Sequence, residues 1–233
     1  MRLVNPRAAA SITRLLSAAA ICALVGGSIA GCGQVATTLG KGGPPSEQQE
    51  TAFPDDGYLK IGSGPRTVDL YLDAMCPYCK VFEQTSGPLL WADAEKGETT
   101  VRLHPLAILD RLSQGTEYST RAAAYLTAVA EAEPDKLRGF VQALYAHQPA
   151  ENSSGLSNQQ LDALASASGI SADLTPASYV GWVRAQTALA LQGPLPTTDQ
   201  VSAIQHVPTV IVQGDVFAGD SSASDLFESF YLA

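Results

Sequence analysis

Positive charge is scarce in this sequence. Its 233 residues include 14 Lys and Arg residues against 23 Asp and Glu residues, which gives a formal net charge of −9. This excess of negative charge disfavours nucleic acid and anionic lipid as partners, so we expect neither. Charged residues make up 16% of the chain and hydrophobic residues 45%. Such a composition excludes a disordered protein and is typical of a globular domain built around one core.

Acidic residues are absent from the N-terminal part of the chain, where the first one is Glu47. Three arginines lie in the first 14 residues, and an apolar run rich in Gly and Ala follows over residues 15–32. This run is too short and too rich in small residues for a convincing membrane span. A positive segment followed by a short apolar one predicts an export signal over residues 1–31.

The end of the apolar run reads Ile29-Ala30-Gly31-Cys32. This tetrapeptide resembles the lipobox of bacterial lipoproteins, in which the cysteine is lipidated and becomes the mature N-terminus. The resemblance implies that Cys32 anchors the protein to the outer face of the cytoplasmic membrane. A plain secretory signal and an uncleaved anchor are the alternatives, and all three place the rest of the chain outside the cytoplasm.

Cysteine is scarce too, with four residues in the chain. Cys22 lies inside the apolar run and Cys32 at its end, so neither is expected in the folded domain. Cys76 and Cys79 remain as its one cysteine pair, in a compartment where disulfides persist.

The chain between the apolar run and the pair divides into a tether and the start of a domain. Residues 32–57 are rich in Gly, Pro, Thr and Gln and are predicted to be a flexible tether; the domain is expected over residues 58–233. Two strand-like segments at 58–61 and 67–73 precede the pair. A helix interrupted at Gly87-Pro88 and a strand over 99–104 follow it. This order predicts a βαβ unit with the cysteines at the carboxyl end of a strand.

The middle of the chain has a helical pattern, which predicts a helical insertion over about residues 113–193. Five apolar residues repeat at helical spacing along one face, namely Leu137, Phe140, Val141, Leu144 and Tyr145. Ser157 and Gln160 have the spacing of a capping box. Thr175-Pro176 is expected to start the last helix of the insertion, and Gly193 to end it.

Strand patterns return after the insertion. Residues 208–212 are β-branched, Gly214-Asp215 predicts a turn, and Val216-Phe217 predicts the returning strand of a hairpin. The last residues form an amphipathic helix for which we expect Ser222 to be the N-cap. The complete order, β-α-β, helical insert, β-β-α, predicts an α/β fold.

The sequence Cys76-Pro77-Tyr78-Cys79 fits the needs of thiol–disulfide exchange. The reaction requires an exposed thiolate of lowered pKa, and a second cysteine near enough to resolve the mixed disulfide. At the start of a helix, the free backbone N–H groups favour a negative charge on the first sulfur, while the second sulfur lies one turn further in. Pro77 suits the first helical turn, because a backbone N–H at that position would have no partner within the helix and Pro has none to leave unpaired.

Two other interpretations of the cysteine pair are weaker. A zinc site normally needs four ligands, and the three histidines, His104, His147 and His206, have neither the spacing nor the second cysteine pair that such sites use. We therefore predict no metal and no cofactor besides the redox-active disulfide itself. A structural staple is disfavoured because so short a loop constrains the unfolded chain very little.

The chain resembles the DsbA-like thiol–disulfide oxidoreductases, which have a thioredoxin-like fold interrupted by a helical insertion domain. The resemblance covers residues 58–233. It rests on the insertion, Phe82 and two short segments, Cys76-Pro77-Tyr78-Cys79-Lys80 and His206-Val207-Pro208-Thr209. It implies a cis peptide bond before Pro208, which would face the disulfide, and contact between the Val207 backbone and an extended substrate. Members best known for this activity carry Pro-His between the cysteines, so Pro77 and Tyr78 are expected to set the redox potential.

Two acidic residues precede the pair on one face of the expected strand, Asp69 and Asp73. Thioredoxin-fold enzymes often bury a carboxylate beneath the second cysteine to assist proton transfer, and either residue could serve as this relay. Solvated acids at the end of a strand are an equally good interpretation.

The function predicted from these features is that of a cell-envelope enzyme which introduces disulfides into exported proteins. Its partners would be exported proteins with free thiols and a membrane protein that reoxidises the pair. Disulfide reduction or isomerisation by the same pair is one alternative. A non-catalytic, peptide-binding or chaperone-like lipoprotein is another.

Overall fold

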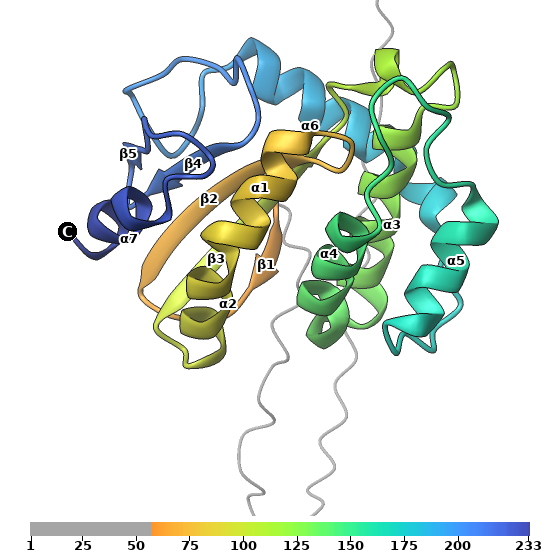
Figure 1. The fold of residues 1–233 in the computed structure, drawn as a ribbon, viewed down its shortest axis with the longest axis horizontal. Helices are drawn as coiled ribbons and strands as arrows, with labels where there is room; N and C mark the ends of the chain where they lie inside the picture. The colour runs from red at the N-terminus through yellow and green to blue at the C-terminus, as the bar shows by residue number, and fades with distance from the viewer. Residues whose placement is uncertain (1–56) are drawn as a thin grey trace, which may run out of the picture. The chain divides into compact units, whose positions relative to one another are not determined.

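The computed structural model describes residues 57–233, which are coloured in Figure 1. The predictions for the export signal, for Cys22 and Cys32 and for nearly all of the tether lie outside these residues. Five strands form one sheet in the order β1-β3-β2-β4-β5. The strands are β1 Leu59–Ile61, β2 Arg66–Asp73, β3 Thr99–Leu106, β4 Thr209–Val212 and β5 Asp215–Val216. β2 and β3 are parallel, and the other neighbouring pairs are antiparallel.

Two helices connect β2 to β3, α1 at Pro77–Thr85 and α2 at Gly87–Glu95. The break between them confirms the predicted interruption at Gly87-Pro88. Pro88 has no N–H to donate, and Gly87 lies so close to the Glu83 carboxyl that a Cβ would stand 2.9 Å from its oxygen. The βαβ unit is therefore present, with the cysteine pair following β2.

Four helices lie between β3 and β4, within the range predicted for the insertion. They are α3 Tyr118–Ala132, α4 Leu137–Ala146, α5 Asn158–Ala167 and α6 Val180–Gln192. The capping box of α5 is confirmed, because Gln160 N donates to Ser157 Oγ at 3.2 Å and Ser157 N to Gln160 Oε1 at 2.8 Å. Figure 1 shows α3, α4 and α5 grouped beside the sheet, with α4 next to the helices of the βαβ unit.

Three details of the sequence prediction were wrong. Pro176 begins a 3-10 turn, Pro176–Tyr179, and α6 starts only at Val180. The hairpin turn is Gln213-Gly214, both with positive φ, because β4 and β5 pair from Val212 to Asp215. The last helix, α7 Ser224–Leu232, is not capped by Ser222, because the backbone N–H and hydroxyl of Ser222 both donate to Asp220 Oδ1.

The core lies on both sides of the central strand β2, whose residues from Val68 to Asp73 are all buried. On one side, α1 packs against α7 through the rings of Phe82 and Phe227, whose centroids are 5.1 Å apart. Within residues 57–233, no helix combines the length and the apolar character that a membrane crossing needs.

Candidate active site at the start of α1

The chain turns sharply between β2 and α1, and this turn places Cys76 at the helix start. Cys76 N donates to the carbonyl oxygen of Asp73 at 3.0 Å, and Cys76 is the N-cap residue of α1 in an extended conformation. Pro77 takes the first helical position, as its missing N–H predicts. Because the free N–H groups of a helix start face its N-cap, the Cys76 sulfur lies where negative charge is favoured.

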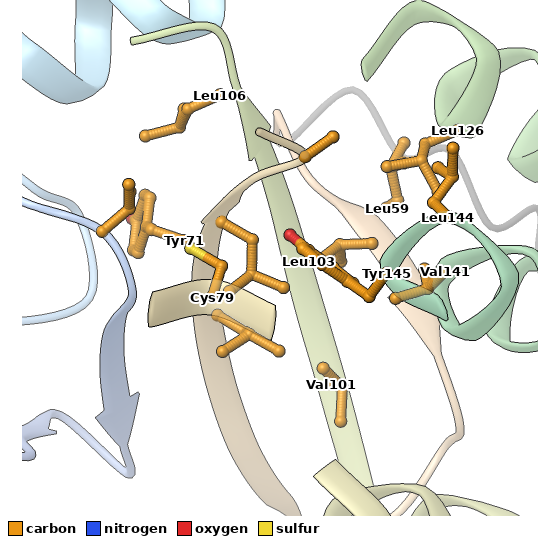
Figure 2. Packing of buried hydrophobic residues seen from close by; sticks show 14 of the residues in the cluster. Leu59, Tyr71, Cys79, Val101, Leu103, Leu106, Leu126, Val141, Leu144 and Tyr145 are labelled. Atoms are coloured by element: carbon orange, nitrogen blue, oxygen red, sulfur yellow. The ribbon is translucent and has the colours of Figure 1, made fainter. Parts of the chain in front are cut away.

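The two cysteines, both free in the structure, have opposite electrostatic settings. Hydrogen bonding by the Cys79 thiol and by the backbone N–H groups of Cys79 and Tyr78 lowers the pKa of Cys76, against the effect of burial. Burial in the core raises the pKa of Cys79 well above its usual range. Figure 2 shows the Cys79 side chain among the apolar side chains of the core. This arrangement makes Cys76 the more acidic of the two thiols and therefore the better candidate for the nucleophile.

Cys76 is more buried than the sequence led us to expect, with 4% of its surface exposed. The covering segment comes from the other end of the domain. β4 pairs with β2 in the register Tyr71 to Thr209, so the residues before Thr209 lie beside the residues that follow β2. The Val207–Pro208 peptide bond is cis, as the resemblance implied. The Cys76 thiol donates to the carbonyl oxygen of Val207 at 3.3 Å.

A groove with a volume of about 770 Å³ opens next to this contact. Its walls come from α1, from the segment around Pro208 and from the residues that follow β5. They are Tyr78, Phe82, His206, Val207, Pro208, Val210 and residues 216–221. Tyr78 is 63% exposed, so a large aromatic ring stands open to solvent at the rim. A groove with largely apolar walls, one of which includes the Val207 segment that Cys76 contacts, can hold an extended peptide near that sulfur.

Asp73 is fully buried, which excludes a solvated acid at the strand end. Its carboxylate accepts from Met75 N at 2.9 Å, Ser119 Oγ at 2.7 Å and Leu109 N at 2.9 Å. Burial raises the pKa of Asp73 to about 6, although these three donors oppose the shift. The charge of Asp73 in turn raises the pKa values of Cys76 and Cys79. Asp73 is therefore electrostatically coupled to the pair.

Asp69 is buried as well, but its partners are on β3. Its carboxylate bonds to His104 Nε2 at 2.9 Å and to Arg102 NH1 at 3.5 Å. The His104 ring in turn stacks on Tyr71, with centroids 4.0 Å apart. These contacts assign Asp69 and His104 to a polar cluster on the sheet. His206, by contrast, lies exposed on a wall of the groove.

Two residues of the helical insertion contact the active-site turn, and the sequence analysis did not identify them as part of the site. Gln148 Nε2 donates to the carbonyl oxygens of Ala74, at 3.1 Å, and Cys76, at 2.9 Å. The Tyr145 hydroxyl donates to the carbonyl oxygen of Asp73 at 3.2 Å. Tyr145 was assigned to the apolar stripe of its helix, where it does lie, and Gln148 follows α4 with no pattern that would single it out.

The sequence model of the family described as thioredoxin matches residues 62–229. No curated protein matches the chain. Among solved structures, the chain is similar to the reduced disulfide bond oxidoreductase DsbG of Mycobacterium tuberculosis, with 26% sequence identity and a TM-score of 0.60. The match covers 76% of this chain and 88% of that one.

Two further solved structures are similar to this chain. Reduced DsbA of Mycobacterium tuberculosis is 24% identical, with a TM-score of 0.59, and the match covers 74% of this chain and 91% of that one. Oxidised BdbD of Bacillus subtilis is 21% identical, with a TM-score of 0.58, covering 76% and 91%. These matches confirm the predicted thioredoxin-like fold with its helical insertion.

Proposed function

Because the chain belongs to the thioredoxin family and is a DsbA-like thiol–disulfide oxidoreductase, we propose that it introduces disulfide bonds into exported proteins through Cys76 and Cys79. The observation that supports this most directly is the pair itself. Cys76 lies at a helix start with a lowered pKa, next to the cis-Pro208 segment, while Cys79 is buried behind it.

In the proposed cycle, a substrate thiolate attacks Cys76 Sγ of the oxidised pair, and the Cys76–Cys79 bond breaks as a mixed disulfide forms. A second substrate thiolate then attacks the substrate sulfur, and Cys76 leaves as a thiolate. The substrate loses two electrons, and the cysteine pair gains them. Because the leaving Cys76 thiolate is stabilised by its hydrogen bonds, the reduced pair is favoured, and oxidation of the substrate is favoured with it.

Substrate binding is proposed at Val207 and Pro208. In the structure the carbonyl oxygen of Val207 already accepts from the Cys76 thiol, so this segment lies within reach of any sulfur bonded to Cys76. A peptide lying in the groove would pass Tyr78 at the rim, and we propose that Pro77 and Tyr78 set the redox potential.

We place the proton relay at Asp73 and not at Asp69. Asp73 influences the pKa of both cysteines, whereas the carboxylate of Asp69 is bonded to His104 and Arg102. Asp73→Asn should prolong the lifetime of a mixed disulfide with a single-cysteine peptide, because the Cys79 thiol, which must lose its proton to displace that peptide, then exchanges the proton more slowly. Rapid acid quenching and mass spectrometry would measure that lifetime, with Asp69→Asn as the matched control. Equal lifetimes in the two variants would contradict this assignment.

We further propose that residues 1–31 are an export signal, that Cys32 carries a lipid at the outer face of the cytoplasmic membrane, and that residues 32–57 form a tether. The tether would hold the domain of residues 58–233 near a membrane protein that reoxidises the pair. Mass spectrometry of the N-terminal peptide tests this, and an unmodified Cys32 in the mature protein would refute the lipid anchor.

The deciding experiment combines an oxidation assay with a redox titration. The purified oxidised protein should form a disulfide in a reduced two-cysteine peptide, and its reduction potential should lie well above that of thioredoxin. A potential as low as that of thioredoxin would instead support a reductase or isomerase. No oxidation of the peptide, together with unchanged biological activity in Cys76→Ser, would support a non-catalytic peptide-binding protein.

A further inference from the structure

Glu83 is a buried acid that the proposed cycle does not use. It lies on α1 one turn beyond Cys79, on the side of the helix that faces the core, and 6% of its surface is exposed. Helical residues four positions apart lie on the same face, so the Cys79 and Glu83 side chains leave the helix in the same direction. An ionisable side chain in this position needs partners that stabilise its charge.

The partners of Glu83 are too few for a permanent charge. Trp91 Nε1 donates to its Oε1 at 2.8 Å, while its Oε2 is buried and has no hydrogen-bond partner among the described residues. Asp73, which is also buried, accepts three hydrogen bonds. Burial raises the pKa of Glu83 to about 7, so a proton binds and leaves near neutral pH. A proton on Oε2 would remove the cost of the unpaired negative charge.

The titratable groups around Glu83 belong to the active site. Tyr145 is buried on α4, and the pKa of its phenol is raised by burial and by the charges of Cys79, Asp73, Glu83 and Cys76. These four groups therefore surround one side chain. α2 contributes the neutral Trp91. Glu83 and the two sulfurs thus belong to one buried cluster around Tyr145, in which little water screens a charge.

We propose that Glu83 binds a proton when the pair is reduced and releases it when the pair is oxidised, which offsets the charge that appears on Cys76. This proposal rests on the redox function of the pair. Two substrate thiols give up two electrons and two protons as their disulfide forms. The electrons break the Cys76–Cys79 bond; one proton goes to Cys79 Sγ and the other to Glu83 Oε2. Cys76 is left as a thiolate.

The buried charge is the same on both sides of this reaction. In the oxidised protein it is on the Glu83 carboxylate, and in the reduced protein it is on the Cys76 thiolate. Two negative charges in one poorly solvated cluster repel each other, so keeping one of them neutral favours reduction. Glu83 thus influences the redox equilibrium of the cysteine pair through its own charge and does not touch the substrate.

The first test is the equilibrium of the pair with glutathione, measured for the full-length protein and for Glu83→Gln between pH 5.5 and 8.5. Gln is close in size to a protonated Glu and can still accept from Trp91. We expect equal equilibrium constants at pH 5.5, where Glu83 is neutral. At pH 8.5 the variant should be reduced up to about tenfold more readily, since a pKa difference of one unit between redox states gives this ratio.

Infrared difference spectroscopy of the wild-type protein reads the proton directly. Reduction should produce the C=O band of a protonated carboxyl group, which should persist in Asp73→Asn and be absent in Glu83→Gln. Trp91→Phe removes the one donor to Glu83 and should move the pH at which the band appears upward. A constant ratio of equilibrium constants across the pH range, or no band on reduction, would overturn the inference. Failure of both proteins to exchange with glutathione would instead refute the redox function.

Discussion

The sheet with its flanking helices and the helical insertion make different contributions to one site. The first region supplies both sulfurs and the cis-Pro208 segment, which are the groups proposed to contact a substrate. The insertion supplies Ser119, Tyr145 and Gln148, which bond to the Asp73 carboxylate and to the carbonyl oxygens of the turn between β2 and α1. The reactive atoms thus come from one region, and the other fixes the backbone and the charge beneath them.

The largest effect is expected from removing the reactive group itself. Cys76→Ser should lower the rate of peptide oxidation by about 10³-fold or more, because no group of the insertion can replace a nucleophilic sulfur. Cys79→Ser cannot form the oxidised pair, but its Cys76 can attack a peptide disulfide and release the other peptide sulfur as a thiolate. The resulting mixed disulfide should persist because no Cys79 thiol is present to displace the peptide, and gel electrophoresis without reductant would detect it. If Cys76→Ser retained more than a few per cent of the wild-type oxidation rate, the assignment of the reactive sulfur to the sheet and its flanking helices would be wrong.

The next effect concerns Asp73, where the two regions meet. Its pKa is raised to about 6 in the fold from an ordinary value of 3.8, so the stability it contributes is complete below pH 3.8 and is lost as the pH rises through 6. Relative to Asp73→Asn, the wild type should lose roughly 3 kcal/mol of unfolding free energy over that range. Urea unfolding at several pH values would measure this.

The exposed Asp225 on α7 offers a control for Asp73, since its replacement by Asn also removes one carboxylate. If the unfolding free energies of the wild type and Asp73→Asn differed by the same amount at every pH, the burial of an ionised carboxylate at this position would be contradicted.

A smaller effect is expected from Gln148, which belongs to the insertion alone. Gln148→Ala removes two hydrogen bonds to the active-site turn and should lower the unfolding free energy by about 1–2 kcal/mol. The Cys76 carbonyl keeps its bond from Lys80 N, so the helix start should survive. Alkylation of Cys76 as a function of pH should reveal an altered thiol pKa. Gln142→Ala, at an exposed position of α4, is the matched control, and equal pH profiles would argue against a role for Gln148 in the site.

The smallest effect is expected from Tyr145→Phe. The Asp73 carbonyl loses one donor but keeps Cys76 N at 3.0 Å, so the loss of unfolding free energy should be about 1 kcal/mol or less. Thermal or urea unfolding measures it. Tyr125→Phe, which removes a hydroxyl that bonds within the insertion, provides the comparison. A change in the redox equilibrium in Tyr145→Phe alone would show that the hydroxyl affects the charge of the pair as well.

Local features of the site could be predicted from the sequence because local rules determine them. The alternation of β2, the proline at the first helical position and the break before Pro88 each depend on a few neighbouring residues. The same is true of the capping box at Ser157. Ser222 was a failed prediction of the same kind, because the neighbouring Asp220 accepts both its donors. A competing local hydrogen bond outweighed the helix cap there.

Contacts between distant segments could not be predicted in this way. Gln148 and Tyr145 reach residues more than 70 positions earlier in the chain, and no pattern of spacing encodes that approach. The burial of Cys76 depends on Val207, 131 positions away. The position of Glu83 illustrates a third case. Its place on the buried side of α1 follows the helical period, but α2 determines that one carboxyl oxygen has a partner, Trp91, and the other has none among the described residues.

The narrow access to Cys76 has a consequence for the timing of the reaction in the cell. A sulfur that is 4% exposed, beside the Val207 wall of the groove, is more readily approached by a single extended strand than by a cysteine on the flat surface of a finished protein. If the protein introduces disulfides as proposed, cysteines would therefore be oxidised while their chains are still emerging or unfolded. Oxidation would then precede folding, and the order in which cysteines become available would influence which bonds form first.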